Sequence, residues 1–278
     1  MRKISTRNMV MSLLHTAGVL FIIFYILFPI FWITITAFKT RRDAFTTKIF
    51  FTPTFDNFSV LFDGNPYDFT PLIRNSVFIA VTTVAIAVPL AIMAAYAFSR
   101  YKFRGKNSLL ILVLSAQFLP ATVVLLPYFI QFRNLGLLDT LQGLLILNLA
   151  GAIPFGIWLV KGFIDSLPQE IEQAALVDGA TEFQVLRYVT IPLIRPGIIV
   201  AVVFAFVGAW NEFLFAFIMT SSEKARPMMV GLLSLVEVQG VPWELMSAAG
   251  LIIMVPIFIL AIAIRKHFVG GLTMGAVK

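Results

Sequence analysis

The sequence predicts an all-α membrane protein with six membrane-spanning helices. Two features of its composition point to this fold class: 59% of the 278 residues are hydrophobic and only 13% are charged, and the mean hydropathy is +0.93. A water-soluble chain of this length could not keep so much apolar surface inside. The third observation is the placement of the charges, which leaves long apolar runs between them.

Six runs are long enough to cross a bilayer, which takes about 20 apolar residues. Five lack Asp, Glu, Lys and Arg, and the sixth contains only Glu212; the runs are 8–38, 75–99, 107–132, 140–160, 245–264 and 196–222. Their apolar residues do not alternate with period two, so helices are expected and not barrel strands. We therefore expect one transmembrane domain over 1–278.

The first span is expected at about 16–38. It has no small-residue cleavage site after a short apolar core, so a retained span is expected and not a removed signal peptide. A polar segment on the external side follows it. The remaining spans are expected at 75–98, 108–129, 141–160, 197–219 and 245–264, with a tail at 265–278.

Prolines recur inside the expected spans, at Pro29, Pro89, Pro120, Pro127, Pro154 and Pro256. One interpretation is tolerated kinks, because neighbouring helices can satisfy the carbonyls that a proline frees. The other is broken helices around a substrate cavity. The sequence leaves both open.

The positive charges predict the orientation of the chain. Thirteen of the 21 Lys and Arg residues fall on the side that carries both termini, against eight on the other side. The positive-inside rule therefore places the termini and the loop 100–106 in the cytoplasm. The basic residues of this loop, among them Arg100, are expected to set topology and to meet anionic lipid head groups. The net charge of +7 thus needs no nucleic-acid partner.

The cytoplasmic segment 165–195, between the fourth and fifth spans, is predicted to form two short helices. Ser166 and Gln169 have the spacing of a capping box at the start of the first helix. Gly179 stands where a left-handed C′ residue would end it. Thr181 and Gln184 then form a second capping box.

The second helix of this segment is expected to stop before Pro192. On the first helix, spacing places Ile171, Ala174, Ala175 and Asp178 on one face. Small side chains allow another surface to approach closely, which favours a docking element. An amphipathic pair lying on the membrane surface has the same pattern.

The stretch "EQAALVDGA", followed by "IPLIRPG", resembles the EAA loop of ABC-importer permease subunits. The family's Glu before the alanines is Gln173 here, with Glu172 one place earlier, and its Leu before Pro192 is Ile191. In that family the helix docks in a cleft of a cytoplasmic ATPase. The resemblance implies that the residues coupling this chain to the ATPase are Glu172, Gln173, Ala174, Ala175, Asp178, Gly179 and Ala180.

The resemblance extends over nearly the whole chain. "NSVFIAVTTVAIAVPLAIMAAYAFSRYKFRGK" and "GAWNEFLFAFIM" resemble spans of carbohydrate-type permeases, and "GGLTMGAVK" resembles the tail of the maltose-type second permease. It implies sugar import by alternating access in a bacterial or archaeal plasma (inner) membrane. The implied partners are a second homologous permease, a homodimeric ATPase that holds ATP and Mg, and an extracytoplasmic solute-binding protein. The tail residues implied to contact the ATPase are Gly271, Leu272, Thr273, Met274 and Gly275.

Glu212 is the only ionisable residue inside an expected span. A carboxylate in hydrocarbon costs at least ~2.5 kcal/mol, so it must face protein or water. With its neighbours Trp210 and Asn211, and with Gln117 and Asn148 in other spans, it is a candidate for the substrate pathway. Packing between helices or subunits is the alternative role for all five.

Several kinds of chemistry have no support in the sequence. It contains no GxxxxGK[ST] motif, so ATP hydrolysis must come from a partner, and it contains no cysteine. No metal site or bound cofactor is expected. An ion-coupled secondary transporter using Glu212, or a membrane scaffold without transport, would account for the spans. Neither needs a capped, alanine-faced cytoplasmic loop.

Overall fold

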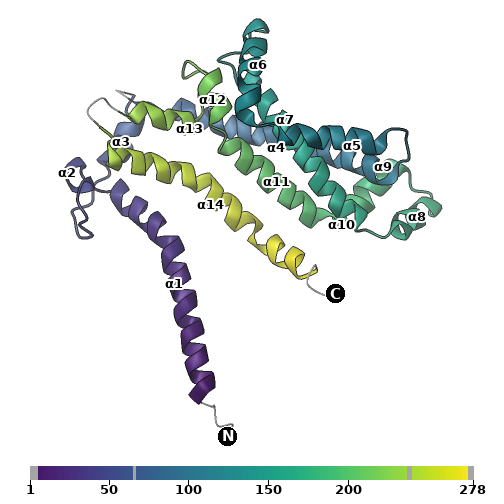
Figure 1. Cartoon of the computed structure of the whole chain (residues 1–278), viewed down its shortest axis with the longest axis horizontal. Coiled ribbons are helices and arrows are strands. Elements are labelled where there is room, and N and C mark those ends of the chain that lie inside the picture. The colour runs from purple at the N-terminus through teal and green to yellow at the C-terminus, as the bar shows by residue number, and fades with distance from the viewer. Residues whose placement is uncertain (1–5, 65–66, 237–239, 275–278) are drawn as a thin grey trace. The chain divides into compact units, whose positions relative to one another are not determined.

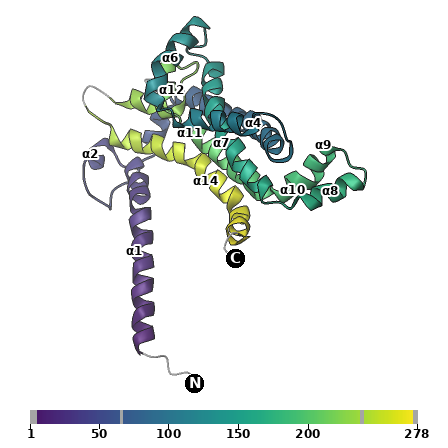
Figure 2. The same ribbon diagram turned by 45° about the vertical axis from the view of Figure 1, so that its right-hand side comes forward.

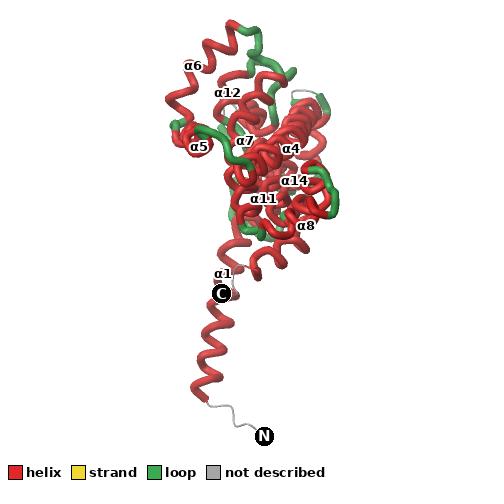
Figure 3. Tube along the Cα trace, turned by 90° about the vertical axis from the view of Figure 1, so that its right-hand side faces the viewer, coloured by secondary structure: helices red, strands yellow, loops and turns green. Residues whose placement is uncertain are grey.

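The computed structural model describes residues 6–64, 67–236 and 240–274. Every regular secondary-structure element in these ranges is a helix, as the prediction required (Figure 3). In chain order the elements are α1 (Thr6–Ala37), α2 (Arg41–Ala44), α3 (Asp56–Phe62), α4 (Phe69–Arg100), α5 (Lys106–Ser115), η1 (Ala116–Phe118), α6 (Ala121–Asn134), α7 (Leu141–Asp165), α8 (Gln169–Val177), α9 (Glu182–Val185), η2 (Leu186–Thr190), α10 (Ile191–Leu193), α11 (Arg195–Trp210), α12 (Leu214–Met219), α13 (Met228–Gly231), η3 (Leu232–Leu235) and α14 (Trp243–Met274).

Among the described residues, four helices are long and apolar enough to span a membrane: α1, α4, α7 and α14. Two further candidates are bent pairs of helices, so the total is six if each pair counts as one span. In the first pair, α5 with η1 meets α6 at 96°; in the second, the helices over 182–193 meet α11 at 80°.

The third expected span, 108–129, is therefore not one straight helix. The chain turns at Leu119, whose backbone is extended (φ −71°, ψ 121°). Pro120 causes this, because a proline disfavours the helical conformation of the residue before it. The other five prolines lie inside α1, α4, α6, α7 and α14, where the helix continues past them, so the helix is broken at Pro120 and continuous at the other five.

The fifth expected span, 197–219, is also interrupted. Helix α11 ends at Trp210, and α12 begins only at Leu214. Glu212 lies in the break. Its carboxylate accepts hydrogen bonds from the backbone N–H groups of Phe215 (2.8 Å) and Ala216 (2.9 Å), two of the unpaired donors at the start of α12.

The chain, expected as a single domain, divides into two compact units. Unit 1 comprises the described residues of 1–68 and 234–255, and unit 2 those of 69–233 and 256–278. In unit 1, buried Asn57 donates to the carbonyls of Ala37 and Lys39, both at 2.8 Å, and so satisfies the end of α1. The buried ammonium of Lys39 lies 4.7 Å from the ring centroid of Trp32.

The core of unit 2 is formed where α4, α7 and α11 lie side by side (Figure 1). Small residues allow the helices to approach closely. A Cβ atom added to Gly156 would stand 2.9 Å from the Cβ of Ala91, and one added to Gly197 would stand 2.3 Å from the ring of Phe163. Figure 2 shows α8, α9 and α10 together at one end of this unit, and α6 and α12 at the other.

Candidate functional site

The segment 165–195 forms the two short helices expected, but the first of them is not capped as predicted. Ser166 closes α7, and its hydroxyl donates to the carbonyl of Phe163 (2.7 Å). Pro168 stands at the N-cap of α8 without a side-chain hydrogen bond. The predicted capping box at Ser166 and Gln169 is therefore wrong, because the serine bonds back to the preceding helical turn.

The turn between the two helices forms as predicted. Gly179 has φ +89°, its N–H donates to Leu176, and the N–H of Ala180 donates to Ala175, both at 3.0 Å. These two bonds make a Schellman motif. The second capping box is confirmed: Thr181 Oγ1 accepts from the N–H of Gln184 (3.3 Å), whose Oε1 accepts from the N–H of Thr181.

The sequence predicted that the second helical stretch would stop before Pro192, and this prediction is wrong. After α9 the chain forms a π-helical turn, η2, and the N–H of Ile191 donates to the carbonyl of Leu186, five residues back. Helix α10 then includes Pro192, and the direction changes at Ile194. A proline ring clashes with the carbonyl four residues before it in an α-helix. The wider π turn is a geometry that avoids this spacing.

Helix α8 and the start of α9 present an exposed surface of mixed polar and apolar residues. Ile171, Ala174 and Asp178 are exposed, as the predicted face requires, but Ala175 is half-buried. Val177 is 87% exposed, and Phe183 at the start of α9 is 67% exposed. Gln173 is also exposed, so it belongs to this surface. We call Gln173, Ala174, Val177, Asp178 and Phe183 the outer face.

Glu172 does not belong to the outer face. It is buried and forms an ion pair with Arg100, the last residue of α4. Its other carboxylate oxygen accepts from Thr190 Oγ1 (2.6 Å). Arg100 also donates to the carbonyls of Ile164 (2.9 Å) and Leu167 (3.4 Å). Arg100 is thus held by protein groups instead of meeting lipid head groups, and the one-residue offset of Glu172 turns its side chain inward.

A second contact joins the loop after α4 to the same segment. The hydroxyl of Tyr101 donates to the carboxylate of Glu182, the first residue of α9. This hydrogen bond raises the pKa of Tyr101 to about 12, because ionisation of the phenol would break it. The pair is exposed, unlike the Arg100–Glu172 pair.

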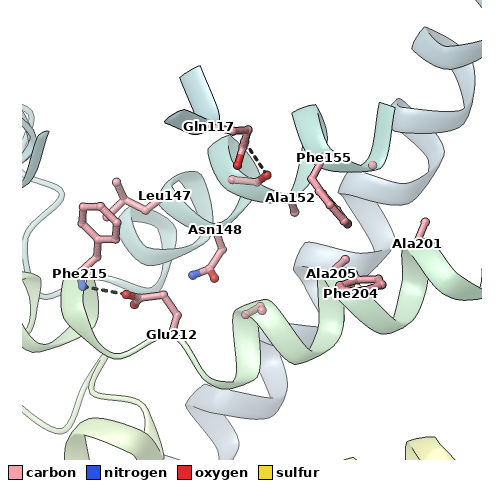
Figure 4. A pocket seen from close by; sticks show the side chains of 14 residues that line it. Gln117, Leu147, Asn148, Ala152, Phe155, Ala201, Phe204, Ala205, Glu212 and Phe215 are labelled. Atoms are coloured by element: carbon pink, nitrogen blue, oxygen red, sulfur yellow. Dashed lines mark hydrogen bonds between the residues drawn. The ribbon is translucent and has the colours of Figure 1, made fainter. Parts of the chain in front are cut away.

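Three of the five candidate pathway residues come together at a cavity of about 390 Å³ between α7 and α11 (Figure 4). They are Gln117, Asn148 and Glu212. Trp210 is instead buried against the ring of Phe206 (5.7 Å between centroids), and Asn211 is exposed and does not line the cavity.

The polar side chains of this cavity keep hydrogen-bonding groups that the protein does not use. The amide nitrogen of Gln117 donates to the carbonyl of Gly151 (3.0 Å), and that of Asn148 donates to Leu144 (2.9 Å). Each amide retains its oxygen as an acceptor and one N–H as a donor. The carboxylate of Glu212 accepts hydrogen bonds from the start of α12. The site therefore suits a ligand with hydroxyl groups, such as a polyol, because a hydroxyl both donates and accepts.

The sequence interpretation missed the apolar walls of the cavity. Phe155 and Phe204 lie with ring centroids 5.1 Å apart, and Phe215 completes the aromatic lining. Gly151 and Gly208 also line it, where small residues leave space. The sequence feature that could have predicted the cavity is the presence of these two glycines in the middle of two expected spans.

The C-terminal candidates are only partly described. Gly271, Leu272, Thr273 and Met274 belong to α14, and Gly275 lies outside the described residues. Within the described ranges, no cluster of three His, Cys, Asp or Glu residues could hold a metal ion.

Comparison with known proteins gives concordant results. The family model described as "Binding-protein-dependent transport system inner membrane component" matches residues 87–273. The diacetylchitobiose uptake system permease protein DasC of Streptomyces coelicolor is 30% identical, with 95% of each chain covered. The trehalose transport system permease protein SugB of Mycobacterium tuberculosis is 34% identical over 91% of this chain and 93% of its own.

The fold is also known from a crystal structure. A chain of a bacterial ABC transporter that imports the acidic polysaccharide alginate matches with a TM-score of 0.81 and 21% identity, over 96% of this chain and 100% of that chain. This likeness establishes the helical arrangement.

Proposed function

The chain belongs to the family of binding-protein-dependent transport system inner membrane components, and on that premise we propose that it is a permease subunit of an ATP-driven sugar importer. Relatives named as uptake permeases for sugars support the substrate class. The observation that carries the coupling role is the outer face, which lies on two short helices joined by a fixed turn and includes the exposed apolar side chains of Val177 and Phe183.

The outer face is the proposed docking surface for a cytoplasmic ATPase. The Schellman motif at Gly179 and the capping box at Thr181 fix the two short helices at a set angle, so that a push on one reaches the other. The apolar exposed side chains of Val177 and Phe183 would be covered by the partner. We also propose that the termini and the tail residues 271–275 lie on the cytoplasmic side, where the ATPase would hold ATP and Mg.

The position of the segment 165–195 explains how docking could act on substrate. The segment connects the end of α7 to the start of α11, and the same two helices line the cavity. Closure of the ATPase would displace α8, move the ends of α7 and α11, and change access to the cavity. The partners proposed are a second permease, two ATPase copies and an external solute-binding protein.

The cavity supports a sugar as the transported solute. Its volume of about 390 Å³ falls in the range of roughly 300–1,000 Å³ typical of small-molecule sites. Gln117 and Asn148 offer oxygen acceptors to hydroxyl groups, and the rings of Phe155 and Phe204 offer surfaces to the apolar face of a sugar. Family membership favours this role over an ion-coupled transporter based on Glu212.

The first experiment is purification of the tagged chain in mild detergent with identification of stoichiometric partners. We expect a P-loop ATPase and a second multi-span subunit. Val177→Glu, which places a charge on the outer face, is expected to release the ATPase. Phe50→Glu is the matched control, since Phe50 is 94% exposed but lies in the segment between α2 and α3. Retention of the ATPase by Val177→Glu would contradict the docking assignment.

The cavity is tested by transport kinetics. Asn148→Leu is expected to raise the sugar concentration that gives half-maximal uptake by about tenfold, the cost of one lost hydrogen bond to a buried hydroxyl. Gln142→Leu, on the same helix but not lining the cavity, is the control. Equal effects of the two changes would argue against the cavity as the sugar site.

A further inference from the structure

A buried ion pair connects four elements at the end of unit 2 that holds α8. The side chains of Arg100 and Glu172 are only 11% and 6% exposed. Arg100 ends α4, its guanidinium donates to the carbonyl of Ile164 near the end of α7, and Glu172 belongs to α8. Thr190, in the π turn η2, donates to the same carboxylate. One carboxylate thus joins α4, α8 and η2, and through Arg100 it joins α7.

The pair makes a connection that the path of the chain does not make. Helix α8 follows α7 directly, but Arg100 and Glu172 are 72 positions apart in the sequence. Without this pair, a movement of α8 would reach α4 only through side-chain packing and the exposed Tyr101–Glu182 hydrogen bond. Surface ion pairs are weak because water and salt screen them, whereas removal of one partner of a buried pair leaves an uncompensated charge.

We propose that the Arg100–Glu172 pair, closed by Thr190, is the rigid link that makes α4 move with α8 when the ATPase closes. This inference rests on the proposed docking of α8. Because α4 and α11 pack on α7, the link lets the three core helices of unit 2 move as one body. The chain leaves this body directly after Arg100, at the exposed residues 101–105, so α5 and α6 are free of the link.

The exposed contact between Tyr101 and Glu182 cannot replace the buried link. It lies on the surface, where the phenol can exchange the carboxylate for water. Arg100 and Glu172 are therefore positioning residues: they touch neither the sugar cavity nor the outer face of α8. Their loss should separate ATP hydrolysis from uptake without releasing the ATPase.

The natural absence of cysteine allows a direct mechanical test. The double variant Arg100→Cys/Glu172→Cys is assembled with partner subunits and reconstituted in liposomes. We expect the ATPase to remain bound and active while sugar uptake falls about tenfold, within the usual range of coupling energies between sites. A short bifunctional thiol reagent that bridges the two cysteines should restore uptake. Each single cysteine variant, treated with the same reagent, is the control.

Three results would overturn the proposal: unchanged uptake in the double variant, uptake that stays low after bridging is verified by mass spectrometry, or uptake lost only in proportion to bound ATPase. If the double variant does not assemble, Glu172→Gln decides. It keeps an oxygen for Thr190 but removes the charge that pairs with Arg100, so uptake should fall while ATP hydrolysis continues. Normal uptake in Glu172→Gln would then refute the link.

A control ion pair lies in unit 1. Lys48 and Asp43 form an exposed pair at 3.8 Å, and Lys48→Ala should leave coupling unchanged. The docking proposal fails separately, through retention of the ATPase by Val177→Glu. If Val177→Glu releases the ATPase while Glu172→Gln transports normally, docking stands and only the link is wrong.

Discussion

Replacement of Glu212 tests whether this residue holds the broken span together. The structure gives its carboxylate two backbone partners, the N–H groups of Phe215 and Ala216, at 2.8 and 2.9 Å. Phe213, at the N-cap of α12, contributes no side-chain hydrogen bond. Glu212→Ala removes both acceptors, whereas Glu212→Gln keeps one neutral oxygen. The two changes should therefore destabilise the protein to different degrees.

The magnitude follows from the groups left unpaired. A buried backbone donor without an acceptor costs about 1–3 kcal/mol, but loss of an N-cap in contact with water costs only about 0.5–2 kcal/mol. Since Glu212 borders a cavity, water can replace part of its role, so about 2–4 kcal/mol is expected for Glu212→Ala. At roughly 2–4 °C per kcal/mol, the melting midpoint should fall by roughly 5–15 °C. Glu212→Gln should lose about half as much.

The assay is thermal unfolding of the purified complex in one detergent, followed by intrinsic tryptophan fluorescence and by size-exclusion recovery after heating. The expected order of midpoints is native, then Glu212→Gln, then Glu212→Ala. Asn211→Ala is the control, because its exposed side chain neighbours Glu212 but accepts neither amide bond. A native-like midpoint for Glu212→Ala would refute the capping role. Uptake that needs no ATP and disappears in Glu212→Gln would instead support an ion-coupled transporter.

Three further changes test the ends of the helices. Burial raises the pKa of Asp139, but hydrogen bonds from Ser222 outweigh this effect and hold the pKa below its usual 3.8. The ionised carboxylate therefore stabilises the fold above pH 3.8, and this stabilisation is lost on acidification. Asp139→Asn should flatten the fall of the melting midpoint below about pH 4. The pKa of Tyr101, raised from 10.0 to about 12, gives stability that is lost as pH rises through this window. Tyr101→Phe should remove that alkaline loss, and an unchanged pH profile for either variant would contradict its assignment. Thr181→Ala should speed amide exchange in α9 by about 2- to 30-fold while Thr181→Ser does not, as mass spectrometry can measure, and equal rates would contradict the cap.

The features predicted correctly depend on short stretches of sequence. The apolar runs locate the candidate spans because the bilayer selects for length and hydropathy, both of which are local properties. The turn at Gly179 and the capping box at Thr181 are also local, since each partner lies within five residues. A left-handed glycine and a reciprocal pair of side-chain bonds need nothing from the rest of the fold.

Where two local outcomes compete, the sequence did not decide between them. Ser166 has the spacing of a cap, but it also lies three residues after the Phe163 carbonyl, and that partner prevails. Among the six prolines of the expected spans, only Pro120 accompanies a sharp break. Pro89 and Pro154 have the same covalent constraint, yet they lie within continuous helices that pack on one another. Packing between helices, which a single sequence does not show, decides which kink is tolerated.

A shift of one residue also determines on which side of α8 a carboxylate lies, as Glu172 and Gln173 show. Successive residues of an α-helix are rotated by about 100°, so an acid moved by one place points to a different side. Here the outward position before the alanines holds neutral Gln173, and the carboxylate of Glu172 points to Arg100. In the docking that we propose, the outer face offers neutral Gln173 at this position, so we expect apolar contacts such as Val177 to contribute more, while the carboxylate of Glu172 stays within the permease.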